Sequence, residues 1–551
     1  MLQAVSALLA IALVSWVLFR RRGGNPTLHN IPGPKRSSWW KGHLGEVYDP
    51  YGWDFHAMME NYGPTTVYDS WFGTKMLYTW DSKAMHHVLV KASESLNWSM
   101  DRGHVLLNKL LFGEGLISTE GSVHRRQRRQ LMPVFTAEHM REMVPIFYRV
   151  SYKLRDTIAK RVENGTQEVR EPHLIHLANN QYNVQIEMLS WLSRTAFELI
   201  GQSGLGVSFD ALDDEEGAHP FSGIIKNVIP LVSRIFLACH YLLPAANRIG
   251  TPNFRRWFVK NSPWGDMRYA EYLSYYMWDL SEEIFEGKKR DLEKGDEAVH
   301  EQLTRGKDIL SVLMNANMNA DAKNKLEEKE LIGQSALART LDVLSTRPEV
   351  QERLRQEIIE SRIKNDGADP DYDELLRLPY LDAVCKEILR LYAPVHRIIR
   401  TSSEDSVIPL ATPVTGKDGS QITEIFFPKG SDVYISLIAS NRSEDIWGPD
   451  AKEWNPERWL NPLPSTVVEA KIPGVYANLM TFNAGGRSCI GFQFSVLEMK
   501  TVLALLVESF RFEATGKEII YELSGVANPT VKGELEQGMR LPMKVTAVKQ
   551  K

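Results

Sequence analysis

Residues 482–491 read FNAGGRSCIG and place one thiol, Cys489, in a glycine-rich loop directly before an apolar run with helical character. The nearby Arg487 and the N-terminus of the following helix both favour the thiolate, which is the form of cysteine that binds a metal. Gly485 and Gly491 carry no side chain, so the backbone can approach a flat macrocycle closely. A thiolate bound to haem iron favours cleavage of the O–O bond. The loop therefore indicates a haem site and oxygen activation.

A single cysteine in a tight turn is more often a buried structural residue, because free cysteine is among the most buried side chains. The whole spacing is more specific than the cysteine alone. The pattern F-x-x-G-x-R-x-C-x-G, formed by Phe482, Gly485, Arg487, Cys489 and Gly491, closely resembles the haem-binding signature of the cytochrome P-450 family, the haem-thiolate monooxygenases. The resemblance implies haem b (iron protoporphyrin IX) as cofactor, Cys489 as the axial ligand of its iron, and Arg487 as a partner of a haem propionate.

Two further segments resemble the core of this family. The helical run Leu381–Leu391 contains Glu387 and Arg390, three residues apart and therefore on one helix face. An isolated pair of this kind is usually a surface feature of little energetic value. Residues 454–459, WNPERW, resemble the family segment whose arginine, here Arg458, closes a triad with the two helix residues behind the haem. The resemblance predicts that the three side chains hold the core together and do not react.

Three more residues are expected to bind haem from their positions in the family pattern. Arg397 lies seven residues after Arg390, where the family often has a contact to a propionate. Residues 121–129, GSVHRRQRR, resemble a family helix in which a tryptophan and an arginine four residues later bind propionates, and here these positions hold His124 and Arg128. A histidine can still donate one hydrogen bond. The alternative interpretation of this basic run is a solvated helix face or a nucleic-acid-binding patch. No matching basic clusters occur elsewhere in the sequence, so we expect no nucleic-acid partner.

One element of the family pattern is absent. Members carry an alanine or glycine, a glycine, a variable residue, an acid and a threonine in a long central helix across the distal haem face, and this motif is not found in the sequence. Residues 327–334 resemble the start of this helix and residues 335–341 its second half, as though about a dozen residues, or ~18 Å of helix, were missing between Gln334 and Ser335. Neither Ser335 nor Thr340 has the neighbours of the missing pair, so the catalytic residues are unknown.

Three explanations account for this gap: a mispredicted or skipped exon, a shortened yet active helix, and a haem protein without ordinary monooxygenase chemistry. The missing acid and alcohol help to deliver protons to dioxygen in the family. The clean junction favours the first explanation. The gap also motivates an alternative function, a non-catalytic haem- or ligand-binding membrane protein.

The N-terminus carries a targeting signal. Residues Leu2 to Phe19 are almost wholly apolar, about the minimum length for a spanning helix, and three arginines follow at once. A cleaved signal would have its positive charge before the apolar run, while a buried helix remains an alternative. Positive charge after the run predicts that the main body stays in the cytosol. We expect a transmembrane anchor at residues 1–19, a basic and Pro/Gly linker at 20–36 and a catalytic domain at 37–551, as in microsomal members, which span the endoplasmic reticulum membrane once.

Composition agrees with one large intracellular domain. The chain has 551 residues, a formal net charge of −4 and three cysteines, too few for a disulfide framework. Alternation in residues 65–80 predicts a small strand-rich portion, while helical spacing dominates the rest, so the expected fold is mainly α with a minor β region, as in the family. Helical spacing is clear at residues 140–160, 269–292 and 349–363, and extended segments are expected around 398–414 and 422–435.

Substrate choice is expected to depend on two segments, the loop of residues 97–117 and the apolar stretch 221–243. The apolar stretch fits an apolar substrate that enters from the membrane and fits ordinary helix packing equally well. The sequence resembles fungal members that modify secondary metabolites such as terpenoids. The resemblance implies insertion of one atom of dioxygen into a hydrophobic small molecule, with electrons from NADPH supplied by an NADPH-cytochrome reductase that Arg125 and Arg129 would dock, unless these charges only solubilise their helix.

Overall fold

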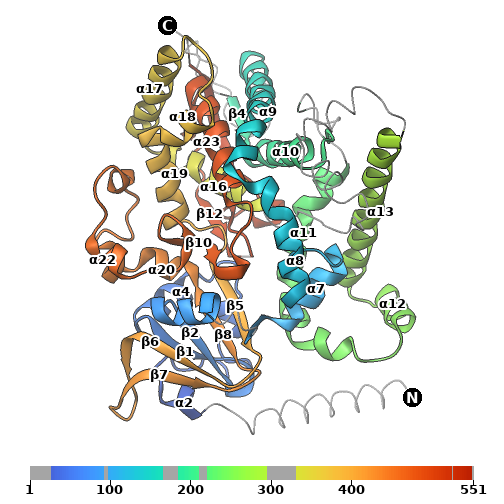
Figure 1. Cartoon of the computed structure of the whole chain (residues 1–551), viewed down its shortest axis with the longest axis vertical. Helices are drawn as coiled ribbons and strands as arrows, with labels where there is room; N and C mark the ends of the chain where they lie inside the picture. The colour runs from blue at the N-terminus through green and yellow to red at the C-terminus, as the bar shows by residue number, and fades with distance from the viewer. Residues whose placement is uncertain are drawn as a thin grey trace.

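Figure 1 shows the computed structural model, which describes residues 26–91, 97–165, 184–209, 212, 220–293, 330–523 and 525–548. Helices make up most of the molecule, and the largest sheet lies at the end where the described chain begins. The expected mainly α fold with a minor β region is therefore confirmed. The expected anchor at residues 1–19 lies outside the described residues, as does the linker before residue 26. In the part of the chain that the structure describes, no helix is both long and apolar enough to span a bilayer.

The helical body is built around α23 (Phe492–Ser509), whose side chains are buried along nearly its whole length. It begins directly after the cysteine loop and packs against α9 (Ala137–Glu163), α16 (Glu330–Ser345), α17 (Pro348–Lys364) and α19 (Pro379–Leu391). A helix that is apolar on all sides is stable only inside such a bundle. The core therefore fixes the position of the chain immediately after Cys489.

The main sheet has five strands in the order β1 (Thr65–Asp69), β2 (Lys75–Thr79), β8 (Asp432–Ser436), β5 (Arg397–Ser402) and β3 (Trp98–Met100). Its strands come from distant parts of the sequence. All neighbours are antiparallel except β2 and β8, which run parallel. The expected strands within residues 65–80 are confirmed as β1 and β2.

The two faces of this sheet differ in chemistry. The tyrosine face carries Tyr68, Tyr78 and Tyr434, and the rings of Tyr78 and Tyr434 stack with centroids 4.7 Å apart. The aliphatic face carries residues such as Val67, Leu77 and Val433. Because successive side chains of a strand point to opposite faces, each residue of β5 is assigned a face by its cross-strand partner on β8.

This alternation separates two arginines of β5. Ile399 pairs with Tyr434, so Arg397, two residues earlier, shares the tyrosine face. Arg400 pairs with Val433 and therefore points to the aliphatic face. The two guanidinium groups thus lie on opposite sides of one sheet.

A third group of helices, α7 (Arg102–Phe112), α11 (Pro220–Ala246) and α13 (Gly265–Glu293), packs together beside the sheet. Residues 97–117 were expected to form a loop, and this expectation is wrong because α7 occupies most of the segment. Asp101 caps this helix, since its carboxylate accepts a hydrogen bond from the backbone N–H of His104 at 2.7 Å. The apolar stretch 221–243 lies within α11.

The remaining elements connect these three groups. The other helices include α2 (Pro26–Asn30), α3 (Leu44–Val47), α4 (Trp53–Glu60), α5 (Ser82–His86), α8 (Gly121–Leu131), α10 (Met188–Ile200), α12 (Pro252–Lys260), α18 (Tyr372–Arg377), α20 (Leu437–Arg442), α21 (Glu444–Trp447) and α22 (Ser465–Glu469). The other strands form a hairpin of β6 (Ser406–Thr415) and β7 (Gln421–Phe427), the sheet β11 (Phe510–Ala514), β14 (Pro542–Ala547) and β4 (Val184–Glu187), and the pairs β9 (Gly474–Tyr476) with β10 (Leu479–Ala484) and β12 (Ile519–Glu522) with β13 (Asn528–Val531). The helices expected at residues 140–160, 269–292 and 349–363 are confirmed as α9, α13 and α17, and most of the expected extended segments fall in β5 to β8.

Candidate active site around Cys489

The cysteine loop connects strand β10 to helix α23. The backbone N–H of Cys489 donates to the carbonyl of Phe482 at 2.9 Å, and the N–H of Ser488 donates to the carbonyl of Gly485 at 3.0 Å. These two bonds close the loop onto the end of β10. The Phe482 ring is buried below the loop and packs edge-on against Tyr476. Cys489 forms no disulfide. Because the residue is half-buried, it lies close to the surface of the core.

Gly485 is required at its position by both conformation and space. Its φ angle is +63°, in the left-handed region that side chains disfavour. A Cβ atom there would lie 2.0 Å from the carbonyl oxygen of Leu89, on the neighbouring short helix of residues 87–91. Gly491 differs, because its φ is −96° and its carbonyl accepts the N–H of Ser495 at 3.0 Å in the first turn of α23.

Arg128 ties helix α8 to the cysteine loop. Its guanidinium donates to the carbonyl of Ser488 at 2.7 Å and to the Ser488 hydroxyl at 3.0 Å. Burial lowers the pKa of Arg128, and the nearby Cys489 opposes this effect. His124 lies one turn earlier on the same helix and is buried. Helix α8 therefore meets the cysteine loop through Arg128, while the contact of Arg128 with a haem propionate stays a prediction.

Arg487 and Arg400 extend this cationic group. Arg487 donates to the carbonyls of Leu116, at 3.3 Å, and Thr119. Burial lowers the pKa of Arg487 to about 10, Glu120 opposes this effect, and the positive charge of Arg128 adds to it. Burial also lowers the pKa of Arg400 to about 10, with a further contribution from the positive charge of Arg487.

The three arginines form a cluster with a surplus of positive charge, in which Arg400 is buried and Arg128 and Arg487 are partly buried. Among the described residues, none of Arg128, Arg400 and Arg487 makes an ion pair with a carboxylate. Like charges in a buried cluster are costly unless an anion compensates them. The cluster therefore fits a ligand that brings carboxylates to the loop that carries Cys489, and a flat ligand with two propionates meets this requirement.

Arg397 does not belong to this cluster. It lies on the tyrosine face of the sheet, where its guanidinium carbon is 4.6 Å from the ring centroid of Tyr48. The spacing from Arg390 identified Arg397, whereas the structure brings Arg400 to the cluster. Successive side chains of β5 point to opposite faces of the sheet, and this alternation separates Arg397 from Arg400. The face of each residue can be assigned only once the partner strand β8 is known.

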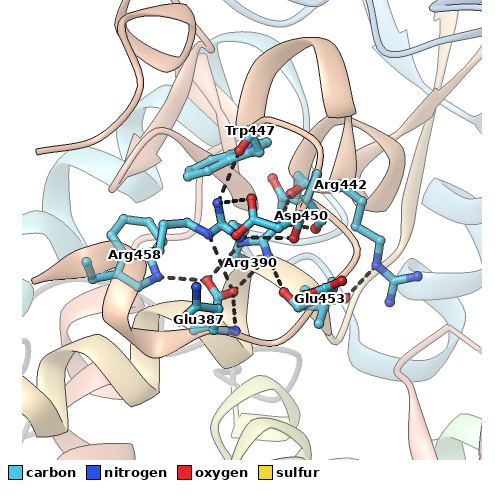
Figure 2. Close-up of polar contacts among 12 residues, drawn as sticks. Glu387, Arg390, Arg442, Trp447, Asp450, Glu453 and Arg458 are labelled. Atoms are coloured by element: carbon cyan, nitrogen blue, oxygen red, sulfur yellow. Dashed lines mark hydrogen bonds and ion pairs between the residues drawn. The ribbon is translucent and has the colours of Figure 1, made fainter. Parts of the chain in front are cut away.

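Figure 2 shows the expected triad, which is confirmed. Arg390 donates twice to Glu387 on α19, at 2.8 and 2.9 Å, and both side chains are completely buried. The Arg458 guanidinium lies 3.6 Å from the same carboxylate and makes a closer pair with Asp450 at 2.8 Å. Arg390 uses its remaining donors on the carbonyls of Asn441, Ala451 and Glu453, at 2.9, 2.6 and 3.1 Å.

Helix α16 contains Gln334 and Ser335, the pair of residues between which the family segment is expected. The helix is continuous from Gln334 into Ser335. The Ser335 hydroxyl donates to the carbonyl of Ala527, and the Thr340 hydroxyl donates to the carbonyl of Ala336 at 2.7 Å within the helix. Both hydroxyls are therefore used in structural hydrogen bonds, and among the described residues neither is paired with an acid.

Comparisons with known proteins identify the family to which the chain is similar. The sequence model of the cytochrome P450 family matches residues 32–536. Cytochrome P450 monooxygenase 91 of Postia placenta is 44% identical, with 97% of each chain covered. The ganoderic acid synthetase of Ganoderma lucidum is 39% identical over 98% of each chain. A cytochrome P450 monooxygenase of Hericium erinaceus is 33% identical, with 99% of this chain and 98% of the relative covered.

Proposed function

This chain belongs to the cytochrome P450 family of haem-dependent oxidoreductases, and we propose that it inserts one atom of dioxygen into a hydrophobic small molecule of fungal secondary metabolism, such as a terpenoid. The cluster of Arg128, Arg400 and Arg487 beside Cys489 is the observation that carries the proposal. The ganoderic acid synthetase among the relatives supports a secondary-metabolite substrate. The non-catalytic alternative finds no support, since relatives across the whole chain are named monooxygenases.

In this proposal Cys489 binds the haem iron, and Arg128, Arg400 and Arg487 bind the propionates. Bound haem supplies the iron at which dioxygen is activated. The chain contributes the anion-stabilising surroundings of the thiolate, because the loop directs Cys489 toward the N-terminus of α23 and Arg128 lies nearby. His124, one turn earlier on α8, takes the family position that binds a propionate. Phe482 and Gly485 set the shape of the loop, while Gly491 starts the helix behind it.

The exposed face of α8 suits an acidic redox partner. Arg125, Arg126 and Arg129 are exposed, whereas His124, Gln127 and Leu131 are buried on the opposite face. Electrostatic complementarity accelerates and orients such encounters. We therefore assign this face to an NADPH-cytochrome reductase, the source of electrons from NADPH.

Helix α12 supports association with the endoplasmic reticulum membrane. Three of its aromatic side chains are largely exposed, with accessible fractions of 47% for Phe254, 61% for Trp257 and 56% for Phe258. Arg255, Arg256 and Lys260 lie on the same short helix. Exposed aromatic rings beside basic residues are typical of helices that lie in the membrane interface. In the proposal this helix adds to an anchor at residues 1–19, with the catalytic domain on the cytosolic side.

Contact of α12 with lipid predicts a specific change in tryptophan fluorescence. We expect vesicles that contain brominated phospholipid to quench Trp257 in the full-length protein, because its ring would enter the interface. Trp257→Phe should lower the fraction of fluorescence that the lipid quenches about twice as much as Trp278→Phe does. Trp278 is another exposed tryptophan, on α13, and serves as the control. Equal effects of the two substitutions would exclude α12 as a lipid contact.

The test of the proposed chemistry must address the junction in α16. We infer that a skipped or mispredicted exon removed about a dozen residues, roughly three turns, between Gln334 and Ser335. Sequencing the native transcript across these codons decides whether the residues exist. A second form of the protein that carries the family segment provides the matched comparison.

Both forms are then loaded with haem and reconstituted with the reductase in vesicles. We expect both to show the red-shifted absorption of thiolate-ligated haem after reduction and CO treatment, because Cys489 and the arginine cluster lie outside the junction. Product formation coupled to NADPH consumption should rise in the restored form, since the acid and threonine that deliver protons return. Equal turnover of the two forms would refute the inferred loss, and absence of the thiolate spectrum in both would refute the haem site.

A further inference from the structure

Arg397 occupies an aromatic environment on the tyrosine face of the sheet. Its guanidinium carbon lies 4.6, 5.8 and 5.9 Å from the ring centroids of Tyr48, Tyr434 and Phe236. Its Nη1 atom donates to the carbonyl of Val47 at 3.1 Å and lies 2.9 Å from Nε2 of His396. These rings attract the cation but do not neutralise its charge.

No carboxylate compensates Arg397 within the described part of the chain. No ion pair of Arg397 occurs there. Asp101, whose charge acts on the neighbouring Tyr48, lies 2.7 Å from the ring nitrogen of His240 and accepts the backbone N–H of His104 at 2.7 Å. Burying the charge of an arginine without a carboxylate partner lowers the free energy of unfolding. Arg397 thus has the capacity to bind an external anion.

Two phenol groups in the same cluster are also unsatisfied. The hydroxyl oxygens of Tyr48 and Tyr68 are buried, and among the described residues they have no hydrogen-bond partner. Burial raises the pKa of both groups well above the usual value, although Arg397 opposes this effect, so both keep their protons and can donate. Buried polar groups are normally paired, so unpaired donors beside an uncompensated cation point to a missing acceptor.

The neighbouring histidines leave Arg397 as the cation of this cluster. Burial lowers the pKa of His56 to about 3, with a further contribution from the charge of Arg397. Burial and Arg397 also lower the pKa of His396 well below its usual value. Both imidazoles are therefore neutral near pH 7. One cation flanked by phenols suits a single negative charge.

The surroundings of this charge are apolar and come from α11. Phe236 packs on Tyr48 with ring centroids 5.3 Å apart. The hydroxyls of Tyr241 and Ser70 lie 2.9 Å apart and join the same helix to the end of β1. The cluster therefore lies between the sheet and α11, the helix that contains the apolar stretch 221–243 expected to contact substrate.

We propose that Arg397, Tyr48 and Tyr68 bind the carboxylate of an otherwise apolar substrate, so that the enzyme selects hydrophobic monocarboxylic acids. This inference rests on the proposed oxidation of a hydrophobic molecule and specifies its class. Nη1 of Arg397 already contacts Val47 and His396, and the Tyr434 hydroxyl also bonds the guanidinium, so the remaining N–H groups would donate to the carboxylate. Phe236 and the ring of Tyr434 contact the apolar body that adjoins the acid group. Arg397 acts on binding and not on the reacting atoms.

The test compares acids with their methyl esters, because the ester keeps the apolar body and loses the charge. The haem-loaded, full-length protein is titrated by calorimetry with dodecanoic, abietic and oleanolic acids and with the three esters. We expect at least one acid to bind about tenfold more tightly than its ester, which corresponds to about 1.4 kcal/mol. Arg397→Gln should remove this preference and leave the affinity for the ester unchanged. Tyr48→Phe should reduce the preference for the acid about threefold, since one hydrogen-bond donor is lost.

Arg511→Gln is the matched control, because Arg511 is a surface arginine with 55% of its side chain exposed. It should keep the full preference for the acid. If every acid binds no better than its ester, or if Arg397→Gln keeps the preference, the proposal is wrong. If Arg397→Gln does not fold, Arg397→Lys and Tyr48→Phe carry the test, and an unchanged preference in both overturns it. The thiolate spectrum is recorded in parallel, so failure of the haem site is seen separately from failure of acid binding.

Discussion

Replacing Cys489 by serine will abolish the spectrum of thiolate-ligated haem and all turnover. Serine keeps the size of the side chain and the backbone hydrogen bond to Phe482, so the loop should stay folded. A hydroxyl does not ionise as a thiol does and cannot supply the electron-rich sulfur ligand. The measurement is the absorption of the reduced, CO-treated protein, together with the haem content after gel filtration. We expect residual haem in the Cys489→Ser protein, held by the arginine cluster, without the red-shifted band.

The other two cysteines supply the controls for this experiment. Burial raises the pKa of Cys239 to about 11 and that of Cys385 to about 12, so both remain thiols near neutral pH. Cys239→Ser should therefore keep the full red-shifted band. If Cys489→Ser also keeps the band, a different residue binds the iron and the assignment of the loop is incorrect.

The parts of the site predicted well from sequence are those in which short spacings determine the geometry. Glu387 and Arg390 are three residues apart on a helix, and this spacing alone places both on one face. The residues around Cys489 are contiguous, so the sequence alone shows which side chains share the loop with the thiol. Arg128 was identified from its position in the family pattern, four residues after His124, and α8 carries both residues.

The parts that could not be predicted depend on contacts between distant segments. The side of the sheet reached by Arg397 or Arg400 is set by pairing with β8, some thirty residues later in the chain, and a single-residue shift reverses it. The helix α7 was missed although a capping aspartate, Asp101, marks its start in the sequence. The partner of Tyr48 is Phe236 of α11, a contact that no local pattern indicates. The acid-binding cluster around Arg397 could therefore be found only in the structure.

Replacing Arg390 by methionine should unfold most of the protein at physiological temperature. The substitution leaves Glu387 charged and completely buried, with Arg458 at 3.6 Å as a weaker ionic partner and only neutral donors from Asn455 and Trp459. Breaking a buried ion pair in this way costs about 3–5 kcal/mol. Three backbone carbonyls also lose their donor, each at about 1 kcal/mol or more. The sum approaches the whole free energy of unfolding of a typical domain, about 5–15 kcal/mol. The yield of soluble, haem-loaded protein and the midpoint of thermal unfolding measure the effect.

A double substitution shows whether the loss comes from the uncompensated charge. Glu387→Leu with Arg390→Met removes both charges, so its destabilisation should be smaller than the sum of the two single changes. Arg141→Met breaks an exposed pair with Asp373, in which 50% and 40% of the side chains are accessible, and should leave the midpoint unchanged. Strict additivity at Glu387 and Arg390 would mean that the pair does not act as a unit. The stability would then come from the separate contacts of Glu387 with Trp459 and of Arg390 with the three carbonyls.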